Sequence, residues 1–471
     1  MPNFVDNFDI VDAGGSVTNV LLQDRGTLAL ANQNALDILS EADDRAQADN
    51  NITTSIGDLG DLNTTDKTNI VSAINEVLVT TDIQWVTPQM FGALGDGVND
   101  DTNAIQQAID TRKLVYFPQG IYRTTAALTM RVGTHLMGKM NNQAHGNTHG
   151  ATILRDGNGN TITVGASTPC VIENLLIDKV NSVNNGIGID ILNTDNFQLK
   201  NVRVINHQTG ISVNGCSFGE IEHCVCERNY GDGFYFTSNS TLGVCQVQVE
   251  SCLSELNDGC GYHYVTRVPA MPVGIFSKNM TFANTRGGVV YERVDSSAYV
   301  TGIKIDGCFI GSDDTLGGIY IGCTNYPVII DNCYFEEAGM TPTGREYDTS
   351  ASYNANAITL FQATRGAMIS NCAICTSAMS GISCSAGASI SNCNFEQNGL
   401  APDVTAIQKC DIHLVAGFHT IMNNMCMSST NGIYKTSAAD AIIVGNIFNN
   451  TNAFQGNTTA KIKNNIGLSD N

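Results

Sequence analysis

Four carboxylates in two consecutive repeats have the spacing of a general acid and a general base. Glu227 and Glu255 each stand three residues after a cysteine, in the matching phrases Ile-Glu-His-Cys and Val-Glu-Ser-Cys. If the repeats stack as neighbouring strands, about 4.8 Å apart, the two glutamates repel each other, which raises one pKa and leaves the other carboxylate ionised. Asp232 and Asp258 follow near the next corner of the same two turns. Hydrolysis of a glycosidic bond needs such a division of roles, so these four residues are the candidate catalytic set.

Three ring-bearing side chains have the spacing of a binding face. Tyr235, His263 and Tyr320 each stand two residues after a glycine that opens a β-type run. Strand alternation therefore points them outward, where their rings suit the binding of sugars. Arg293 joins them as a candidate for binding acidic sugars, together with Arg228, Arg267 and Arg286.

A second candidate cleft lies where Glu336 and Glu337 meet the insertion 338–356, which contains Asp348. The acidic pair at 313–314 is a third candidate, although its sequence is more typical of a turn. The competing interpretation of all these residues is structural. In a chain with 45 acidic residues an outward carboxylate usually faces solvent, and an outward aromatic stripe is also typical of a subunit interface.

A repeated phrase must position these side chains: an apolar residue, two variable positions, and then Cys or Asn. The repeat returns about every 26 residues, which predicts stacked units that share one continuous core. Its last position forms a ladder of twelve turns: Asn174, Asn201, Cys224, Cys252, Asn279, Cys308, Cys333, Cys372, Cys393, Asn424, Asn446 and Asn465.

A second column supports a solenoid built of short strands. A glycine and an apolar residue recur after each ladder position, so that the glycine turns the corner and alternate apolar residues face inward. Asn206, Asn229, Asn257, Asn284 and Asn398 stand five residues after the ladder, as expected of stacked Asn in a turn that tolerates the left-handed conformation. The second column comprises Gly186-Ile187, Gly210-Ile211, Gly233-Phe234, Gly261-Tyr262, Gly288-Val289, Gly318-Ile319, Gly381-Ile382 and Gly432-Ile433.

Composition narrows the function classes. Charged residues make up only 15% of the chain and the formal net charge is −21, which argues against nucleic acid or an anionic membrane as a partner. Six of the 16 cysteines fall on the ladder, where a thiol serves as a small buried apolar group, so we expect structural, reduced cysteines. We expect no metal and no cofactor, because no Cys or His spacing makes a zinc site. No signal peptide or membrane-spanning segment is visible.

The chain divides into three predicted regions. Residues 1–81 are an attachment or trimerisation region, with helices predicted over 28–48 and 63–77. Residues 82–164 form a cap and the first coils, with an Asp-capped helix from about Thr102 covering the open end of the solenoid. Residues 165–471 are the repetitive body.

The cap region carries a resemblance to a known family. Gly95-Asp-Gly, Asp100-Asp-Thr, Ala104-Ile-Gln-Gln-Ala-Ile and Tyr116-Phe-Pro-Gln-Gly-Ile-Tyr resemble the opening of pectate-lyase-like right-handed parallel β-helix domains. Residues 57–77 resemble a segment common in bacteriophage tail fibres and tailspikes. Together they resemble a phage tailspike, an all-β homotrimer that binds, and often cleaves, a bacterial capsule or O-antigen.

The resemblance implies partners and a location. It implies a virion tail protein, assembled in the host cytoplasm, that attaches to other tail or baseplate proteins through residues 1–81 and acts at the bacterial surface. Its activity would be depolymerisation of a polysaccharide, with hydrolysis favoured over elimination. It implies neither a nucleic-acid partner nor membrane insertion.

Other interpretations stay open. A receptor-binding or structural tail protein of the same fold would need no catalysis, and a bacterial or prophage-encoded enzyme would act outside a virion. A polygalacturonase is disfavoured, because the His-Gly pairs at 145–146 and 149–150 precede Asn193-Thr-Asp instead of following it. A calcium-dependent lyase would need an Asp cluster beside a basic residue such as Lys304, and no convincing cluster is visible.

Overall fold

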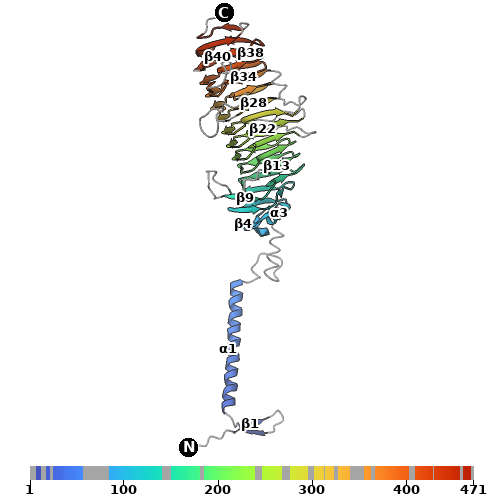
Figure 1. Ribbon diagram of the computed structural model, residues 1–471. Helices are drawn as coiled ribbons and strands as arrows, with labels where there is room; N and C mark the ends of the chain where they lie inside the picture. The colour runs from blue at the N-terminus through green and yellow to red at the C-terminus, as the bar shows by residue number, and fades with distance from the viewer. Residues whose placement is uncertain are drawn as a thin grey trace. The chain divides into compact units, whose positions relative to one another are not determined.

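The chain consists of two units, Met1–Ile83 and Gln84–Asn471 (Figure 1). The second unit is the solenoid that the repeats predict. A computed structural model describes residues 7–11, 17–21, 25–56, 84–139, 150–180, 185–238, 247–267, 276–294, 302–311, 313, 315–322, 327–339, 355–361, 366–401, 409–427, 429–456 and 460–467.

The described residues of the first unit form a hairpin and one long helix. Strands β1 (Asn7–Val11) and β2 (Val17–Leu21) pair antiparallel. Helix α1 (Arg25–Ile56) confirms the helix predicted over 28–48 and extends it at both ends. Leu36, Ile38 and Leu39 on α1 are more than 60% exposed, so the helix buries little apolar surface within its own chain. The helix predicted over 63–77 lies outside the described residues.

The second unit is a right-handed parallel β-helix, as predicted. Within the described residues, three parallel sheets of 13, 15 and 14 strands run along it, which we call sheets I, II and III (Figure 1). Successive strands enter the three sheets in turn, so that from β5 onward each strand pairs with the strand three places on. Sheet I comprises β7 (Leu128–Thr129), β10 (Ile162–Val164), β13 (Ile187–Leu192), β16 (Thr209–Asn214), β19 (Phe234–Thr237), β22 (Cys260–Thr266), β25 (Gly287–Arg293), β28 (Ile319–Ile321), β31 (Ile358–Leu360), β34 (Ile382–Cys384), β37 (Cys410–Leu414), β40 (Asn431–Lys435) and β43 (Asn452–Gly456).

Sheets II and III form the other two sides of the β-helix. Sheet II runs from β3 (Trp85–Val86) to β44 (Lys461–Lys463) and includes β38 (Gly417–Met422). Sheet III runs from β4 (Asp96–Asp100) to β42 (Ile447–Asn449). The strands of sheet III used below are β18 (Val225–Glu227), β21 (Leu253–Glu255), β24 (Met280–Phe282), β27 (Phe309–Gly311), β30 (Tyr334–Glu336) and β39 (Met425–Met427).

A short helix covers the N-terminal end of the β-helix. Helix α3 (Thr102–Asp110) begins where predicted and buries Ala104, Ile105, Ala108 and Ile109. The carboxylate of Asp101 does not cap it: it accepts hydrogen bonds from the backbone of Leu94 and Gly95 and so holds the Gly-Asp-Gly turn. The cap is Asp100, whose Oδ1 lies 3.0 Å from the backbone nitrogen of Thr102.

The ladder is confirmed in ten turns and shifted by one residue in the first two. The ten positions from Cys224 to Asn465 are buried. In the first two turns the buried positions are Leu175 and Val202, while Asn174 and Asn201 precede them with φ of 58° and 53°. The corner demands a left-handed residue at the position before the ladder, and Asn accepts that conformation more readily than most side chains. The prediction therefore mistook two corner asparagines for ladder residues.

The cysteines are reduced in the part of the chain that the structure describes. All 14 described thiols are free, and 13 of them are buried. On the ladder each thiol donates a weak hydrogen bond to a carbonyl, as from Cys333 Sγ to Asp331 O at 3.2 Å. Their neighbours in the stack and burial raise the pKa of Cys333 and of Cys372 to about 12, which suits inert packing groups.

A buried amide ladder joins consecutive rungs at the next corner. Asn229 Nδ2 donates to Asn257 at 2.9 Å, Asn257 Nδ2 donates to Asn284 at 2.8 Å, and Asn284 Nδ2 donates to Asp313 at 2.9 Å. The stack was predicted, but the left-handed residue is the one before each of these asparagines. Asp313 is buried at its end, which is a structural role; its neighbour at position 314 lies outside the described residues. Among the described residues, no helix is both long and apolar enough to cross a membrane.

Candidate functional site

The outer face of sheet I carries a column of polar and aromatic side chains. Pairing of the inward residues Ile211, Phe234, Tyr262, Val289 and Ile319 confirms the predicted second column over these rungs. Their C-terminal neighbours lie on the outer face. The predicted residues Tyr235 and His263 are therefore adjacent, and Tyr320 lies two rungs beyond His263.

The sequence prediction missed Asp190, which also lies in this outer column. It placed the corner glycine of the first turn two residues too early. Ile189, not Ile187, pairs with Ile211, so the corner glycine is Gly188 rather than Gly186. Asp190 therefore lies in the outer column with Ser212 and Tyr235. The sequence offered the signal, because Gly188-Ile189 repeats the pattern two residues after Gly186-Ile187.

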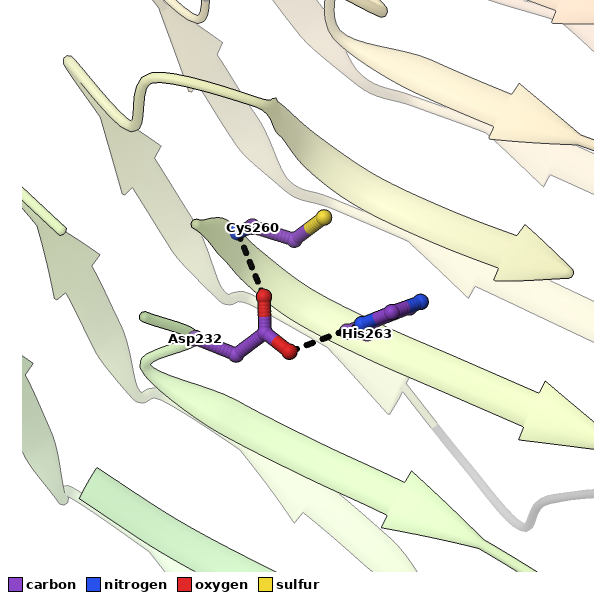
Figure 2. A group of neighbouring side chains, drawn as sticks. All are labelled: Asp232, Cys260 and His263. Atoms are coloured by element: carbon purple, nitrogen blue, oxygen red, sulfur yellow. Dashed lines mark hydrogen bonds and ion pairs between the residues drawn. The ribbon is translucent and has the colours of Figure 1, made fainter. Parts of the chain in front are cut away.

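His263 lies at the centre of a charged cluster. Its Nδ1 is 2.8 Å from Asp232 Oδ2 and its Nε2 is 3.2 Å from Glu292 Oε2. Arg286 Nη2 donates to both oxygens of Glu292, at 2.7 and 2.8 Å, and so fixes that carboxylate. Figure 2 shows Asp232 reaching from the turn before β19 towards the His263 ring on β22. The ring edge also meets Tyr235, with ring centroids 5.4 Å apart.

This cluster favours the protonated form of the imidazole and the ionised form of Glu292. Burial by itself lowers the pKa of His263, but the hydrogen bonds to Asp232 and Glu292 outweigh it, so that the pKa is raised. The hydrogen bond from His263, with the guanidinium of Arg286, lowers the pKa of Glu292 to about 2 although burial opposes this. Both imidazole nitrogens are engaged by carboxylates, so His263 is not a free base.

A groove of about 530 Å³ lies beside this cluster on sheet I. Asp190 and Asp232 both line it, and burial raises the pKa of Asp190 despite hydrogen bonds from Ser212 and Asn160. Asn214 Oδ1 is buried there without a hydrogen-bond partner within the described part of the chain. The groove offers carboxylate, amide and hydroxyl groups together with a cation: Asp190, Ser212, Asn214, Asp232, Tyr235 and Arg267.

Asp232, Cys260 and His263 have the spacing of a metal site but fit one poorly. Their ligand atoms lie within 4.8 Å of one another. Asp232 Oδ1 accepts the backbone N–H of Cys260 at 2.7 Å and its Oδ2 contacts the imidazole, so a metal bound between the two side chains would have to replace the contact to His263. The guanidinium of Arg286 lies 3.7 Å from Cys260 Sγ, where a bound cation would meet its positive charge. Burial also holds the pKa of the Cys260 thiol well above its usual value. The three residues fit a hydrogen-bonded network better.

Glu227 and Glu255 lie elsewhere, on sheet III. They pair across β18 and β21, which confirms that they occupy adjacent rungs. Glu227, however, is fully buried and forms ion pairs with Arg203 and Arg228, so it is not the solvent-facing carboxylate of the competing interpretation. Two arginines cover the carboxylate, and an ion-paired glutamate is the usual result when a carboxylate is removed from water.

The other predicted residues are dispersed. Asp258 is exposed on the turn before β22, and Arg293 is half-buried at the end of β25. Glu336 ends β30, and Glu337 follows it in the left-handed conformation with φ of 56°. Asp348 lies outside the described residues, so the second candidate cleft stays a prediction.

Comparison with known proteins identifies the solenoid. Residues 85–313 match the family model of rhamnogalacturonase A/epimerase, pectate lyase-like. The chain carries a pectate-lyase-like domain. The Asp232–His263–Glu292 cluster lies within this pectate-lyase-like stretch.

Two curated proteins share parts of the chain. The first is a capsule K30/K69-specific depolymerase of Klebsiella phage K64-1, 27% identical over 198 residues, which are 40% of this chain and 24% of that protein. The second is the mannuronan C5-epimerase AlgE1 of Azotobacter vinelandii, 45% identical over 60 residues, which are 10% of this chain and 4% of the epimerase. The chain thus spans a quarter or less of the length of these relatives.

Solved structures agree on the fold of the pectate-lyase-like domain. Tailspike protein 3 of bacteriophage CBA120 superposes with a TM-score of 0.52 at 11% identity, over 91% of this chain and 69% of that chain. The DFA-IIIase of Arthrobacter chlorophenolicus A6 superposes with a TM-score of 0.52 at 10% identity, over 81% of this chain and 99% of that chain. At these identities the likeness concerns the fold alone.

Proposed function

We propose that the chain is a bacteriophage tailspike that recognises and depolymerises a bacterial surface polysaccharide, a capsule or an O-antigen. The observation that carries the proposal is the Asp232–His263 pair beside a polar groove on the outer face of sheet I. The similarity to a phage capsule depolymerase supports both the virion setting and the substrate class. The segment 57–77 supports the same setting.

Two carboxylates of the groove suit the acid and the base of glycoside hydrolysis. Asp190 has a raised pKa and holds a proton more readily, whereas His263 holds Asp232 beside a positive charge. Asp190 would protonate the glycosidic oxygen as the C–O bond breaks. Asp232 would take a proton from the water that attacks the anomeric carbon. Asp190 lies on β13 and Asp232 lies in the turn before β19, two rungs on. Hydrolysis with inversion requires the two carboxyl groups to stand about 6.5–9.5 Å apart, on either side of the scissile bond.

A second candidate pair and a second candidate function remain as proposals. Glu227 with Glu255 is the alternative catalytic pair, which the ion pairs of Glu227 with Arg203 and Arg228 disfavour. A tail protein that binds a polysaccharide without cleaving it is the alternative function. The same groove would serve it, and Tyr235 and Arg267 would then only hold the sugar.

We further propose a homotrimer that attaches to other tail or baseplate proteins through residues 1–81. An isolated helix gains little stability in water, so the exposed apolar residues of α1 favour packing against copies of the same helix. On sheet III an outward apolar column extends over several rungs and suits a subunit interface. It comprises Met280, Phe309 and Tyr334 on three consecutive rungs and Met425 and Ile447 on two later ones, with Ala373 and Asn394 between the two groups.

The decisive experiment is incubation of the full chain with purified polysaccharides. The panel includes Klebsiella K30 and K69 capsules, mannuronan and a set of O-antigens. New reducing ends without unsaturated products are expected from hydrolysis, whereas products with ultraviolet absorption would indicate elimination. Binding without products would favour the non-catalytic tail protein. No binding and no products across the panel would overturn the proposed function.

A further inference from the structure

Two stacked aromatic rings extend the outer face of sheet I beyond the charged cluster. Tyr320 lies on β28, and Phe361 directly follows β31 on the next rung. Their ring centroids are 6.4 Å apart with an interplanar angle of 23°. Phe361 is 47% exposed, which is unusual for so large an apolar ring on an otherwise polar face.

The register places these rings further along the same sheet than the candidate catalytic groups, with β22 and β25 between them. Tyr320 lies two rungs beyond His263, at about 10 Å along the solenoid. Tyr291, Ile321 and Leu360 pair in series, so their C-terminal neighbours Glu292, Gly322 and Phe361 follow one another from rung to rung. Phe361 therefore continues the row in which Glu292 stands, whereas Tyr320 continues the column of His263.

A glycine makes room for the first ring. A Cβ atom added at Gly322 would lie 2.9 Å from Cε1 of Tyr320 and 3.3 Å from the carbonyl oxygen of Tyr291. Real Cβ atoms rarely approach so closely, so a side chain at this position would displace the ring. The Tyr320 ring thus leans over Gly322, which directly follows β28.

We propose that Tyr320 and Phe361 form a distal subsite that stacks against a sugar ring of the bound polysaccharide. The apolar C–H face of a pyranose packs on an aromatic face, while hydroxyl groups at its rim remain in water. The polymer then runs along sheet I, parallel to the solenoid axis, from the Asp190–Asp232 groove to the aromatic pair. This inference rests on the proposed function and adds the direction of the polymer to it.

The test compares binding of one polysaccharide by matched variants of the full chain. The polysaccharide is the member of the K30, K69, mannuronan and O-antigen panel that the wild type binds. Phe361→Ala removes the exposed ring and Gly322→Ala displaces the Tyr320 ring, whereas Tyr320→Phe keeps it. Phe418→Ala is the control, because Phe418 is 59% exposed but lies on β38 of sheet II.

We expect Phe361→Ala and Gly322→Ala to weaken binding about 3- to 10-fold, the range expected for loss of one aromatic stacking contact. Tyr320→Phe and Phe418→Ala should bind as the wild type does. If the protein cleaves the polymer, KM should rise by the same factor while kcat stays unchanged. Wild-type affinity in Phe361→Ala would overturn the subsite and leave the proposed function intact. If Phe361→Ala keeps its affinity but changes the oligomeric state, the rings belong to a subunit interface and the subsite is rejected.

Discussion

Asp232 Oδ2 lies 2.8 Å from His263 Nδ1, and this contact joins two neighbouring rungs of sheet I. The second imidazole nitrogen faces Glu292, so the ring bridges carboxylates from opposite sides. The contact fixes the position of the Asp232 carboxylate at the edge of the groove, and a general base must be held in such a fixed position. The pair also explains why His263 is poorly placed to be that base itself.

Loss of either groove carboxylate should abolish turnover without abolishing binding. We expect Asp232→Asn and Asp190→Asn each to lower kcat about 100- to 10,000-fold, the usual contribution of one general acid or base. The polysaccharide should still bind within a few-fold of the wild type, because the groove keeps its shape. Reducing-end release measures the first effect and calorimetry the second. Glu396→Gln, an exposed glutamate on sheet III, is the control. Wild-type turnover in Asp232→Asn would contradict the assignment.

Periodicity predicted the rungs well and the polar contacts between them poorly. The spacing of the ladder put Tyr235 next to His263 and Glu227 next to Glu255, and pairing confirms both. Asp190 was missed because the sequence offers two corner glycines, Gly186 and Gly188, and the prediction chose the first. An error of two residues leaves the alternation of inward and outward side chains unchanged, so the pattern itself did not reveal the mistake.

Side-chain reach between rungs is what the sequence could not reveal. Glu292 reaches His263 because strand β25 continues as far as Arg293 and so includes Glu292. Arg286, in the turn six residues earlier, fixes the Glu292 carboxylate by hydrogen bonds. The sequence did not show that Glu227 is buried, because the residues that cover it are Arg203, which lies 24 residues earlier on the previous rung, and Arg228, which follows it directly. Spacing predicts neighbours along a column, but not which charges will pair.

The charged cluster should make stability depend on pH within a defined window. The pKa of His263 is raised, so its stabilisation is complete below 6.5 and is lost as pH rises through the raised value. The pKa of Glu292 is lowered to about 2, so its stabilisation is complete above 4.5 and is lost as pH falls towards 2. The melting temperature of His263→Gln should therefore fall furthest below that of the wild type between about pH 4.5 and 6.5. His223→Gln, at an exposed histidine, should show no such window, and an equal gap at all pH values in His263→Gln would refute the cluster.

Glu227→Gln should destabilise the β-helix more than it impairs chemistry. The variant leaves Arg203 and Arg228 facing a neutral amide, and Arg203 is largely buried. Removing one partner of a buried ion pair costs roughly 3 kcal/mol. Chemical denaturation should show this loss, while turnover in the native state stays near that of the wild type. Glu396→Gln is again the matched control, because Glu396 occupies the same column but is exposed. Loss of turnover at full stability would favour Glu227 as a catalytic residue.

Charges placed on α1 should disrupt self-association. Leu36 and Leu39 are 61% and 62% exposed, and a trimeric packing of α1 would bury them. We expect the full chain to have the mass of a trimer by light scattering. Leu36→Asp with Leu39→Asp should lower the mass, because two carboxylates per helix cannot be buried together. Asn34→Asp adds a charge to the same helix and should leave the mass unchanged. A monomeric wild type would reject the trimer.

The amide positions of the ladder should tolerate a thiol better than an aliphatic side chain. Asn424 Nδ2 donates to Ile390 O at 3.0 Å, and its Oδ1 accepts the backbone N–H of Cys393 at 2.9 Å. Asn424→Leu leaves both buried backbone groups without partners, at about 1–3 kcal/mol for each. Asn424→Cys should cost less, because a ladder thiol donates to a carbonyl, as Cys372 Sγ does towards Ser370 O at 3.1 Å. Since a solenoid unfolds locally, amide hydrogen exchange over residues 390–447 is the appropriate measurement. Faster exchange in the leucine variant than in the cysteine variant is expected. Equal exchange in the two variants would mean that packing volume, not hydrogen bonding, determines which residues the ladder accepts.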